Sequence, residues 1–346
     1  MTRSRPRGRR RPGGLAAMLA IVAFVVAALG SHAAGVFSGG EDGGRAAAAG
    51  ESAIAAPAAT RVSPPLPPAP EQQDAVGPLP EPAGAAHVDL TRPSPMSHLR
   101  LTRAPKAGLA FDLADGRVLW RRNATRVRPV ASLTKLMTAL LAVERFGPGQ
   151  LVRIARESDW VGGSRMGGLK PGRRVRAEVL LKGLLISSSN NAAVALAVAG
   201  AGSERAWVAL MNRRARLLGL TCTHYADAHG LDRRNRSCAA DIATLAMRAM
   251  DEPRIVAIAR RRHARVWPGS GRKLTLRTTN HLLRDRYPGA IGLKTGYTIA
   301  AGFCLVAIVE RGERRIGIVT LGSRDAFGDV RRVAREATRM GLLPAA

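Results

Sequence analysis

Strand-like segments lie at both ends of the region 105–341, and helix-like segments fill the part between them. Residues 108–122 alternate in polarity and turn at Ala-Asp-Gly, which predicts a β-hairpin. Residues 302–309 and 314–321 predict a second hairpin. Apolar residues at helical spacing predict helices at 132–146, 177–186, 191–199, 204–218 and 239–250, and a last one with Val330, Val333, Ala337 and Met340 on one face. This order predicts an α/β (α+β) fold in which an antiparallel sheet joins the terminal strands and helices cover both of its faces.

Three short motifs follow one another inside this region. They are Ser132-Leu133-Thr134-Lys135, Ser188-Ser189-Asn190 and Lys294-Thr295-Gly296. Each motif alone is a weak signal. Together and in this order, S-x-x-K, S-x-N and K-T-G resemble the active-site signature of serine acyltransferases that penicillin inactivates.

The first motif carries the chemistry of a nucleophile and its base. Residues three apart on a helix share a face, so Ser132 and Lys135 meet one turn apart. A neutral lysine amine can take the hydroxyl proton, and burial or a second cation such as Lys294 would favour the neutral form. The helix start at Ser132 also favours a developing anion.

The other two motifs supply binding groups. We expect Ser188 to carry the proton towards the leaving amine, and the Asn190 amide to hold the substrate backbone or the lysine. Lys294 and Thr295 can bind a terminal carboxylate, and Gly296 permits a close backbone approach. The backbone N–H groups of Ser132 and Tyr297 would then form the oxyanion hole.

Two motif assignments have competitors within the chain. Ser189-Asn190-Asn191 also reads S-x-N, although its flanking residues favour the frame that begins at Ser188. Ser270-Gly271-Arg272-Lys273 also reads S-x-x-K, but it lies in a turn flanked by Pro and Gly and follows the S-x-N motif. We therefore reject it as the nucleophile motif.

The chain is strongly basic, with a formal net charge of +29. Six of its 54 basic residues are lysines, and two of these are Lys135 and Lys294. Arginine effectively never deprotonates, so a site that needs a neutral amine requires lysine. The chain has no nucleic-acid-binding motif and only 4% aromatic residues, which argues against nucleic acid as a partner. Attraction to anionic lipid or wall polymer fits the charge better.

The N-terminal part predicts export. Residues 1–34 combine an arginine-rich start, an apolar run at 15–30 and a small-x-small cleavage site, which is typical of a signal peptide or, alternatively, a signal anchor that tethers the chain to a membrane. Residues 35–104 are rich in Ala, Gly and Pro and predict a disordered linker. The folded domain is expected at 105–343, in the periplasm or another extracytoplasmic part of the envelope.

The cysteines and the residues around them leave two readings open. A Cys222–Cys238 bridge is possible in an oxidising compartment, but three reduced cysteines are equally consistent with the sequence. Cys222, His224, Asp227 and His229 match no tight metal-ligand motif, so packing or loop roles are favoured and no metal is expected.

Longer segments extend the likeness around the motifs: PVASLTKLMTALLAVE, LLKGLLISSSNNAA, DAHGLD, NHLLRDR and IGLKTGYTIAAGFCLVAIV. They resemble those of the low-molecular-mass penicillin-binding proteins, the serine D-alanyl-D-alanine carboxypeptidases and endopeptidases of the bacterial wall. The resemblance implies a β-lactamase/transpeptidase-like fold. It also implies acylation of Ser132 by peptidoglycan stem peptides ending in D-Ala-D-Ala, inhibition by β-lactams, and no cofactor.

The alternatives differ in what happens after acylation. Only about 50 residues follow Gly296, and this short C-terminal part resembles the compact endopeptidases more than the carboxypeptidases with a second domain. Our main expectation is nevertheless a carboxypeptidase, with an endopeptidase as the alternative. A class A-like β-lactamase needs a glutamate for deacylation, and none occurs between Glu204 and Glu252. A non-catalytic wall-binding module would not need all three motifs.

Overall fold

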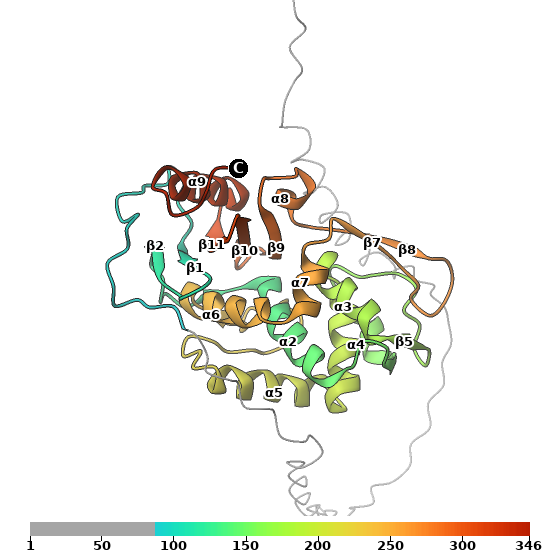
Figure 1. Cartoon of the computed structure of the whole chain (residues 1–346). Coiled ribbons are helices and arrows are strands. Elements are labelled where there is room, and N and C mark those ends of the chain that lie inside the picture. Colours follow the sequence, from blue (N-terminus) through green and yellow to red (C-terminus); the bar gives the residue numbers. More distant parts are fainter. Residues whose placement is uncertain (1–86) are drawn as a thin grey trace, which may run out of the picture. The chain divides into compact units, whose positions relative to one another are not determined.

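The terminal strands meet in one antiparallel sheet, as predicted. The structure is a computed structural model that describes residues 87–346. Its main sheet has the strand order β2-β1-β11-β10-β9. These strands are β1 (Ala107–Asp112), β2 (Val118–Arg122), β9 (Ala290–Thr298), β10 (Gly302–Arg311) and β11 (Arg314–Ser323). The first strand lies beside the last, with Ala107 opposite Leu321 (Figure 1).

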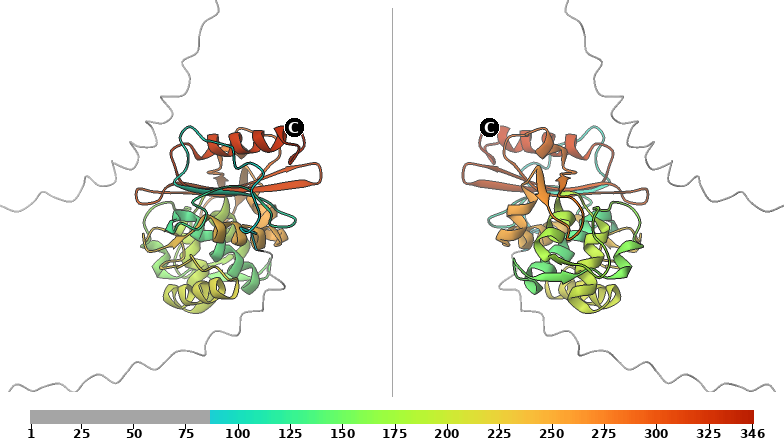
Figure 2. Two further views of the ribbon diagram at one scale, coloured as in Figure 1. Left: turned by 90° about the vertical axis from the view of Figure 1, so that its left-hand side faces the viewer. Right: turned by 90° about the vertical axis from the view of Figure 1, so that its right-hand side faces the viewer.

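Helices cover both faces of this sheet, because its central strands are apolar on both sides. Along β10, Val306 and Ile308 face one core, whereas Leu305, Ala307 and Val309 face the other. The helix α9 (Ala326–Arg339) packs on the second core. Figure 2 shows the sheet edge-on, with α9 on one side and the larger group of helices on the other.

The larger layer contains the predicted helices, with small shifts at their ends. Its helices are α2 (Lys135–Arg145), α3 (Ala177–Ile186), α4 (Asn190–Ala201), α5 (Glu204–Leu217), α6 (Ala239–Met250) and α7 (Pro253–Ala259). The smaller elements are β3 (Arg128–Pro129) with β6 (Arg236–Ser237), β4 (Leu151–Arg153) with β5 (Arg174–Arg176), β7 (His263–Val266) with β8 (Leu274–Arg277), the 3-10 turns η1 (Ala131–Thr134) and η2 (Arg156–Asp159), and α8 (His281–Arg284). The sequence did not predict the three two-stranded pairs, nor did it predict α7, α8 or β9.

The packed part of the chain begins earlier than residue 105. Met96 and Leu101 are buried in the same core as α9, and the Met96 N–H donates to the Leu119 carbonyl at 2.9 Å. The predicted linker end at 104 is therefore wrong. Isolated apolar residues such as Met96 have no periodicity that could have marked them. Met340 was also misplaced, because it follows the end of α9 and is 37% exposed.

The predicted signal segment 1–34 and most of the predicted linker lie outside the described residues. Within residues 87–346, no single helix has the length and apolar character needed to cross a bilayer. Only the bent pair of α4 and α5 meets that test, on length and composition alone, and α4 is largely buried in the core.

The structure contains the Cys222–Cys238 disulfide, with Cα atoms 5.5 Å apart. It ties the segment after α5 to the N-cap of α6. Cys304 is a free, buried thiol in β10, and burial raises its pKa to about 11. Of the two readings that the sequence left open, the structure has the bridged one.

Candidate active site

Ser132 and Lys135 meet at the junction between the sheet and the larger helical layer. The chain forms the 3-10 turn η1 at Ser132, and the α-helix begins only at Lys135. Because a 3-10 turn has three residues per turn, residues i and i+3 lie directly in line. The Lys135 Nζ accordingly lies 2.9 Å from the Ser132 Oγ. The predicted pairing holds, although the local helix type differs.

The amine of Lys135 is fully enclosed and has two further partners. It donates to the Asn190 Oδ1 at 2.7 Å and to the His229 carbonyl at 2.5 Å. The Asn190 amide in turn donates to the Gly162 carbonyl at 2.7 Å, which fixes its orientation. These contacts hold the Lys135 amine beside the hydroxyl of Ser132.

Both lysines of the site have lowered pKa values. Burial, and next the charge of Lys294, hold the pKa of Lys135 well below 10.5, while Asp227 opposes the shift. Burial lowers the pKa of Lys294 to about 7. A neutral Lys135 has a lone pair that can accept the Ser132 proton, which is the state that a general base requires.

Ser188 lies between α3 and α4 in a left-handed conformation, with φ +58°. The Lys294 Nζ donates to its Oγ at 2.9 Å and to the Thr295 carbonyl at 2.8 Å. The side chains of the competing motif Ser189-Asn190-Asn191 have other partners. The Ser189 Oγ shares a hydrogen bond with the Ser187 Oγ, and the Asn191 side chain forms hydrogen bonds with the backbone of Met166. The structure thus brings the Ser188 frame to the site.

The K-T-G motif lies inside strand β9, which precedes β10 in the chain and pairs with it. The Thr295 Oγ1 lies 2.5 Å from the Thr279 Oγ1. A Cβ on Gly296 would lie 2.9 Å from the Ser132 nitrogen, so β9 approaches the nucleophile's backbone closely. Tyr297 follows in the same strand, is 55% exposed, and packs its ring against Phe303 at an interplanar angle of 38°.

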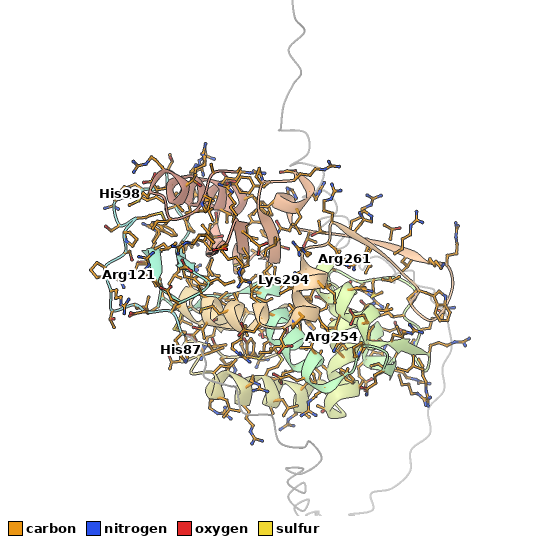
Figure 3. All side chains as sticks on the ribbon, in the orientation of Figure 1. His87, His98, Arg121, Arg254, Arg261 and Lys294 are labelled. Carbon is orange, nitrogen blue, oxygen red and sulfur yellow. A yellow bond between two sulfur atoms is a disulfide. The ribbon has the colours of Figure 1, made fainter. Side chains whose placement is uncertain are left out.

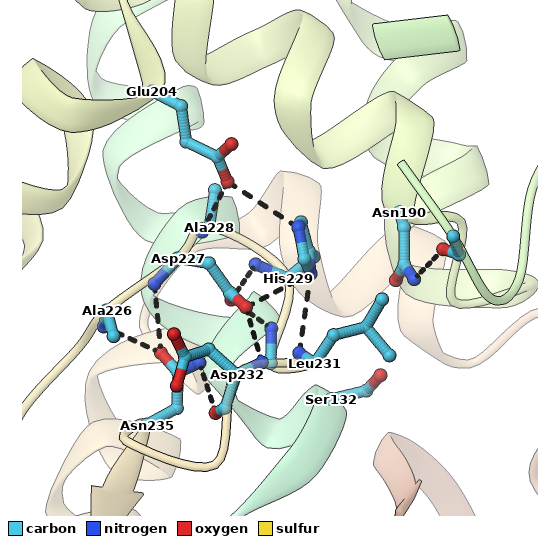
Figure 4. A network of polar contacts seen from close by, with 12 residues as sticks. Ser132, Asn190, Glu204, Ala226, Asp227, Ala228, His229, Leu231, Asp232 and Asn235 are labelled. Atoms are coloured by element: carbon cyan, nitrogen blue, oxygen red, sulfur yellow. Dashed lines mark hydrogen bonds and ion pairs between the residues drawn. The ribbon is translucent and has the colours of Figure 1, made fainter. Parts of the chain in front are cut away.

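The loop 227–232 contributes a part of the site that the motifs did not indicate. The Asp227 carboxylate accepts the N–H groups of His229, Gly230 and Asp232 at 2.9, 2.5 and 2.7 Å (Figure 4). This turn places the His229 carbonyl on the Lys135 amine. The segment DAHGLD was noticed only as part of the resemblance.

His229 and Glu204 form the outer part of this network. The Glu204 Oε1 accepts the Ala228 N–H at 3.0 Å and lies 3.6 Å from the His229 Nε2. Burial lowers the pKa of His229 to about 4, against the opposing effect of Asp227, so its ring is neutral at neutral pH. Burial raises the pKa of Glu204. His229 therefore contributes a carbonyl to the site and no charge.

The rejected residues lie away from this cluster. Ser270 and Lys273 lie in the β7–β8 turn, where the Ser270 Oγ donates to the Gly168 carbonyl at 2.7 Å and Lys273 is exposed. Of the residues considered as metal ligands, Cys222 is in the disulfide and His224 pairs through its backbone with Arg236.

Curated proteins with similar sequences come from several bacteria. D-alanyl-D-alanine carboxypeptidase DacF of Bacillus subtilis is 32% identical over 70% of this chain and 62% of its own length. DacD of Escherichia coli is 36% identical over 63% of this chain and 58% of its own length. A D-alanyl-D-alanine endopeptidase of Pseudomonas aeruginosa is 32% identical over 72% of this chain and 80% of its own length. The match with the first two spans about three fifths of their length.

Solved structures give the same fold. A D-alanyl-D-alanine carboxypeptidase from Mycobacterium tuberculosis has a TM-score of 0.62 at 33% identity, over 66% of this chain and 87% of its own. Penicillin-binding protein 6B of Escherichia coli has a TM-score of 0.64 at 34% identity, over 73% and 81%. Residues 95–325 match the family model Peptidase_S11, described as D-alanyl-D-alanine carboxypeptidase. The motifs, the fold and this match over most of the chain place the protein in the peptidase S11 family.

Proposed function

We propose that the protein is a serine-type D-Ala-D-Ala carboxypeptidase that acts on peptidoglycan stem peptides through an acyl-enzyme at Ser132. The observation that carries this proposal is the enclosed Lys135 amine, 2.9 Å from the Ser132 Oγ and with a lowered pKa. A serine hydroxyl is a weak nucleophile until a base takes its proton. The names of the family and of its relatives support the choice of substrate.

In this mechanism Lys135 removes the Ser132 proton as the oxygen attacks the penultimate carbonyl. The backbone N–H groups of Ser132 and Tyr297 hold the oxyanion. Ser188, hydrogen-bonded to Lys294, passes a proton to the departing D-alanine amine. Water then hydrolyses the ester between the shortened peptide and Ser132, and the oxygen regains its proton.

The substrate is held at its end. The terminal carboxylate lies against Lys294 and the Thr295 hydroxyl, and Gly296 leaves room for the peptide backbone beside β9. The Asn190 side chain orients Lys135 through its Oδ1. Thr279, which no motif indicated, fixes the Thr295 hydroxyl.

A second candidate function is the endopeptidase reaction, which uses the same groups on a cross-linked peptide. The match with the Pseudomonas endopeptidase over 80% of that protein's length favours it. Digestion of purified cross-linked muropeptide dimers beside monomeric pentapeptides separates the two. Loss of dimers with pentapeptide untouched would replace the carboxypeptidase proposal by the endopeptidase one.

A β-lactamase reaction has no support in the site. Deacylation in class A enzymes uses a glutamate-activated water. The carboxylates described above, Glu204 and Asp227, instead accept backbone N–H groups of the 227–232 loop and its neighbour Ala228. Penicillin should therefore form a long-lived acyl-enzyme, and rapid penicillin turnover would contradict this.

The test of the main proposal is release of D-alanine from a pentapeptide that ends in D-Ala-D-Ala. Ser132→Ala should abolish both this release and labelling by radioactive ampicillin. Turnover that survives in the variant, or ampicillin attached elsewhere, would refute the assignment of Ser132. No release by the intact chain, with its fold verified by circular dichroism, would favour a non-catalytic wall-binding module.

The same reasoning gives partners and location. The partners are stem peptides and β-lactams, and nucleic acid is not expected. The enzyme works outside the cytoplasm, where its substrate lies, after export directed by residues 1–34. Residues 15–30 would serve as a tether if they are not removed.

A further inference from the structure

In a long stretch of the chain after α6, all the charged residues are basic. From Pro253 to Arg284 there is no aspartate or glutamate, whereas this stretch has nine lysines and arginines. The stretch includes the β7–β8 hairpin. By contrast, α9 mixes both signs, and its Arg331, Arg332 and Arg339 form ion pairs.

The β7–β8 hairpin has one buried, apolar face and one exposed, charged face. Ala264, Val266 and Leu276 are buried towards the helical layer. Residues of the opposite face are exposed, and the strand pairing places His263 opposite Arg277 and Arg265 opposite Thr275. Arg272 and Lys273 extend this surface at the turn and are also exposed. We call Arg265, Arg272, Lys273 and Arg277 the basic hairpin face.

The four side chains of this face are not neutralised by the protein. None of them forms an ion pair with another residue in the described range 87–346. In Figure 3, nitrogen-tipped side chains follow the β7–β8 arm, and Arg261 marks its start. Four unpaired cations on one small hairpin create a local field that attracts a molecule carrying several negative charges.

The basic hairpin face continues into the active site. Strand β8 ends at Arg277, and Thr279 two residues later contacts Thr295 of the K-T-G motif. Two residues of extended chain span about 7 Å and share one face. A molecule whose end contacts Thr295 can therefore reach Arg277 and the hairpin with its next segments.

We propose that the basic hairpin face binds the carboxylate-bearing strands of peptidoglycan, so that the enzyme acts on the polymer in preference to free peptides. This rests on the proposed function, because that function defines the polymer whose peptide enters the cleft. Each uncleaved stem peptide ends in a free carboxylate, so a strand with many stems is a polycarboxylate. Neighbouring stems then contact the hairpin while one stem is cleaved.

The test uses Arg265→Gln/Arg277→Gln and a matched control, Arg213→Gln/Arg216→Gln, which removes two exposed arginines of α5. Both pairs are placed in a Ser132→Ala background for binding. Co-sedimentation with purified peptidoglycan, stripped of phosphodiester polymers, measures the affinity. The hairpin variant should bind about tenfold more weakly and with a shallower salt dependence than the control. Peptidoglycan with its carboxylates amidated should bind the parent and the hairpin variant equally weakly.

Activity is measured on the same hairpin and control variants with Ser132 intact, and these measurements complete the test. The hairpin variant should keep D-alanine release from soluble pentapeptide within twofold, and lose it several-fold on the polymer. Equal binding losses in the hairpin and control variants, or unchanged binding to amidated polymer, would overturn the proposal. So would binding to anionic lipid vesicles that exceeds binding to peptidoglycan. If D-alanine is not released from either substrate but binding follows the hairpin charge, the catalytic proposal fails and the surface proposal stands.

Discussion

Substituting Gly230 by alanine should damage catalysis by moving the backbone of the nucleophile. Gly230 has φ +92°, and a Cβ there would lie 2.0 Å from the Ala131 carbonyl oxygen and 3.0 Å from the Ser132 nitrogen. The first distance is far inside van der Waals contact, and the obstacle is backbone, so the chain must shift. Left-handed backbone costs an alanine about 1–2 kcal/mol, and overpacking adds about 1–3 kcal/mol. The unfolding free energy should therefore fall by about 2–5 kcal/mol.

The catalytic loss should exceed what destabilisation explains. The proposed oxyanion hole includes the Ser132 N–H, and loss of one such donor lowers the rate about 10²–10³-fold. Stopped-flow acylation by a chromogenic β-lactam measures this on the folded fraction, and urea unfolding measures stability.

Gly172→Ala is the matched control. Gly172 has φ +81°, but nothing lies within 4 Å of its added Cβ. It should lose about 1–2 kcal/mol of stability and acylate at the parent rate. If the folded Gly230 variant acylates as fast as this control, the reasoning about Ser132 is refuted.

Three further predictions concern the charges and the disulfide. Asp227→Asn should lower the unfolding free energy by about 1–3 kcal/mol in urea, because one amide oxygen cannot accept all three N–H groups; an unchanged midpoint would contradict this. The kcat/KM for pentapeptide should rise with pH as Lys135 becomes neutral and fall above about pH 7 as Lys294 loses its proton; a rise that continues to pH 10 would exclude the charged role of Lys294. Cys222→Ser/Cys238→Ser should cost about 3 kcal/mol, since the bridge joins residues 16 apart, and equal thermal stability would count against the bridge.

The parts of the site that could be predicted are those fixed by short-range geometry. Ser132 and Lys135 are three residues apart, so any helical turn brings them together. Even a wrong helix type left the result unchanged. The meeting of β1 with β11 followed from the order of apolar segments, because two terminal hairpins need a shared sheet to bury their faces.

The parts that could not be predicted depend on contacts between distant segments. Asp227 acts by accepting three backbone N–H groups of one loop, and no spacing rule distinguishes that from an exposed loop aspartate. Thr279 follows β8 and contacts Thr295 of β9, a contact between segments of two different sheets that no sequence spacing indicates. Strand β9 was missed because glycine and lysine interrupt its apolar run, although it pairs with β10 over most of its length.

The close approaches around Ser132 explain why glycine flanks the site from two separate segments. A Cβ on Gly230 of the 227–232 loop and one on Gly296 of β9 would lie 3.0 and 2.9 Å from the same Ser132 nitrogen. One glycine belongs to the helical layer and the other to the sheet, so the two layers close on the nucleophile's backbone. A side chain at either position would have to separate them. Gly296 does not have a positive φ, so an alanine there adds no left-handed strain. Gly296→Ala should nevertheless slow acylation as Gly230→Ala does, because both displace the backbone of Ser132.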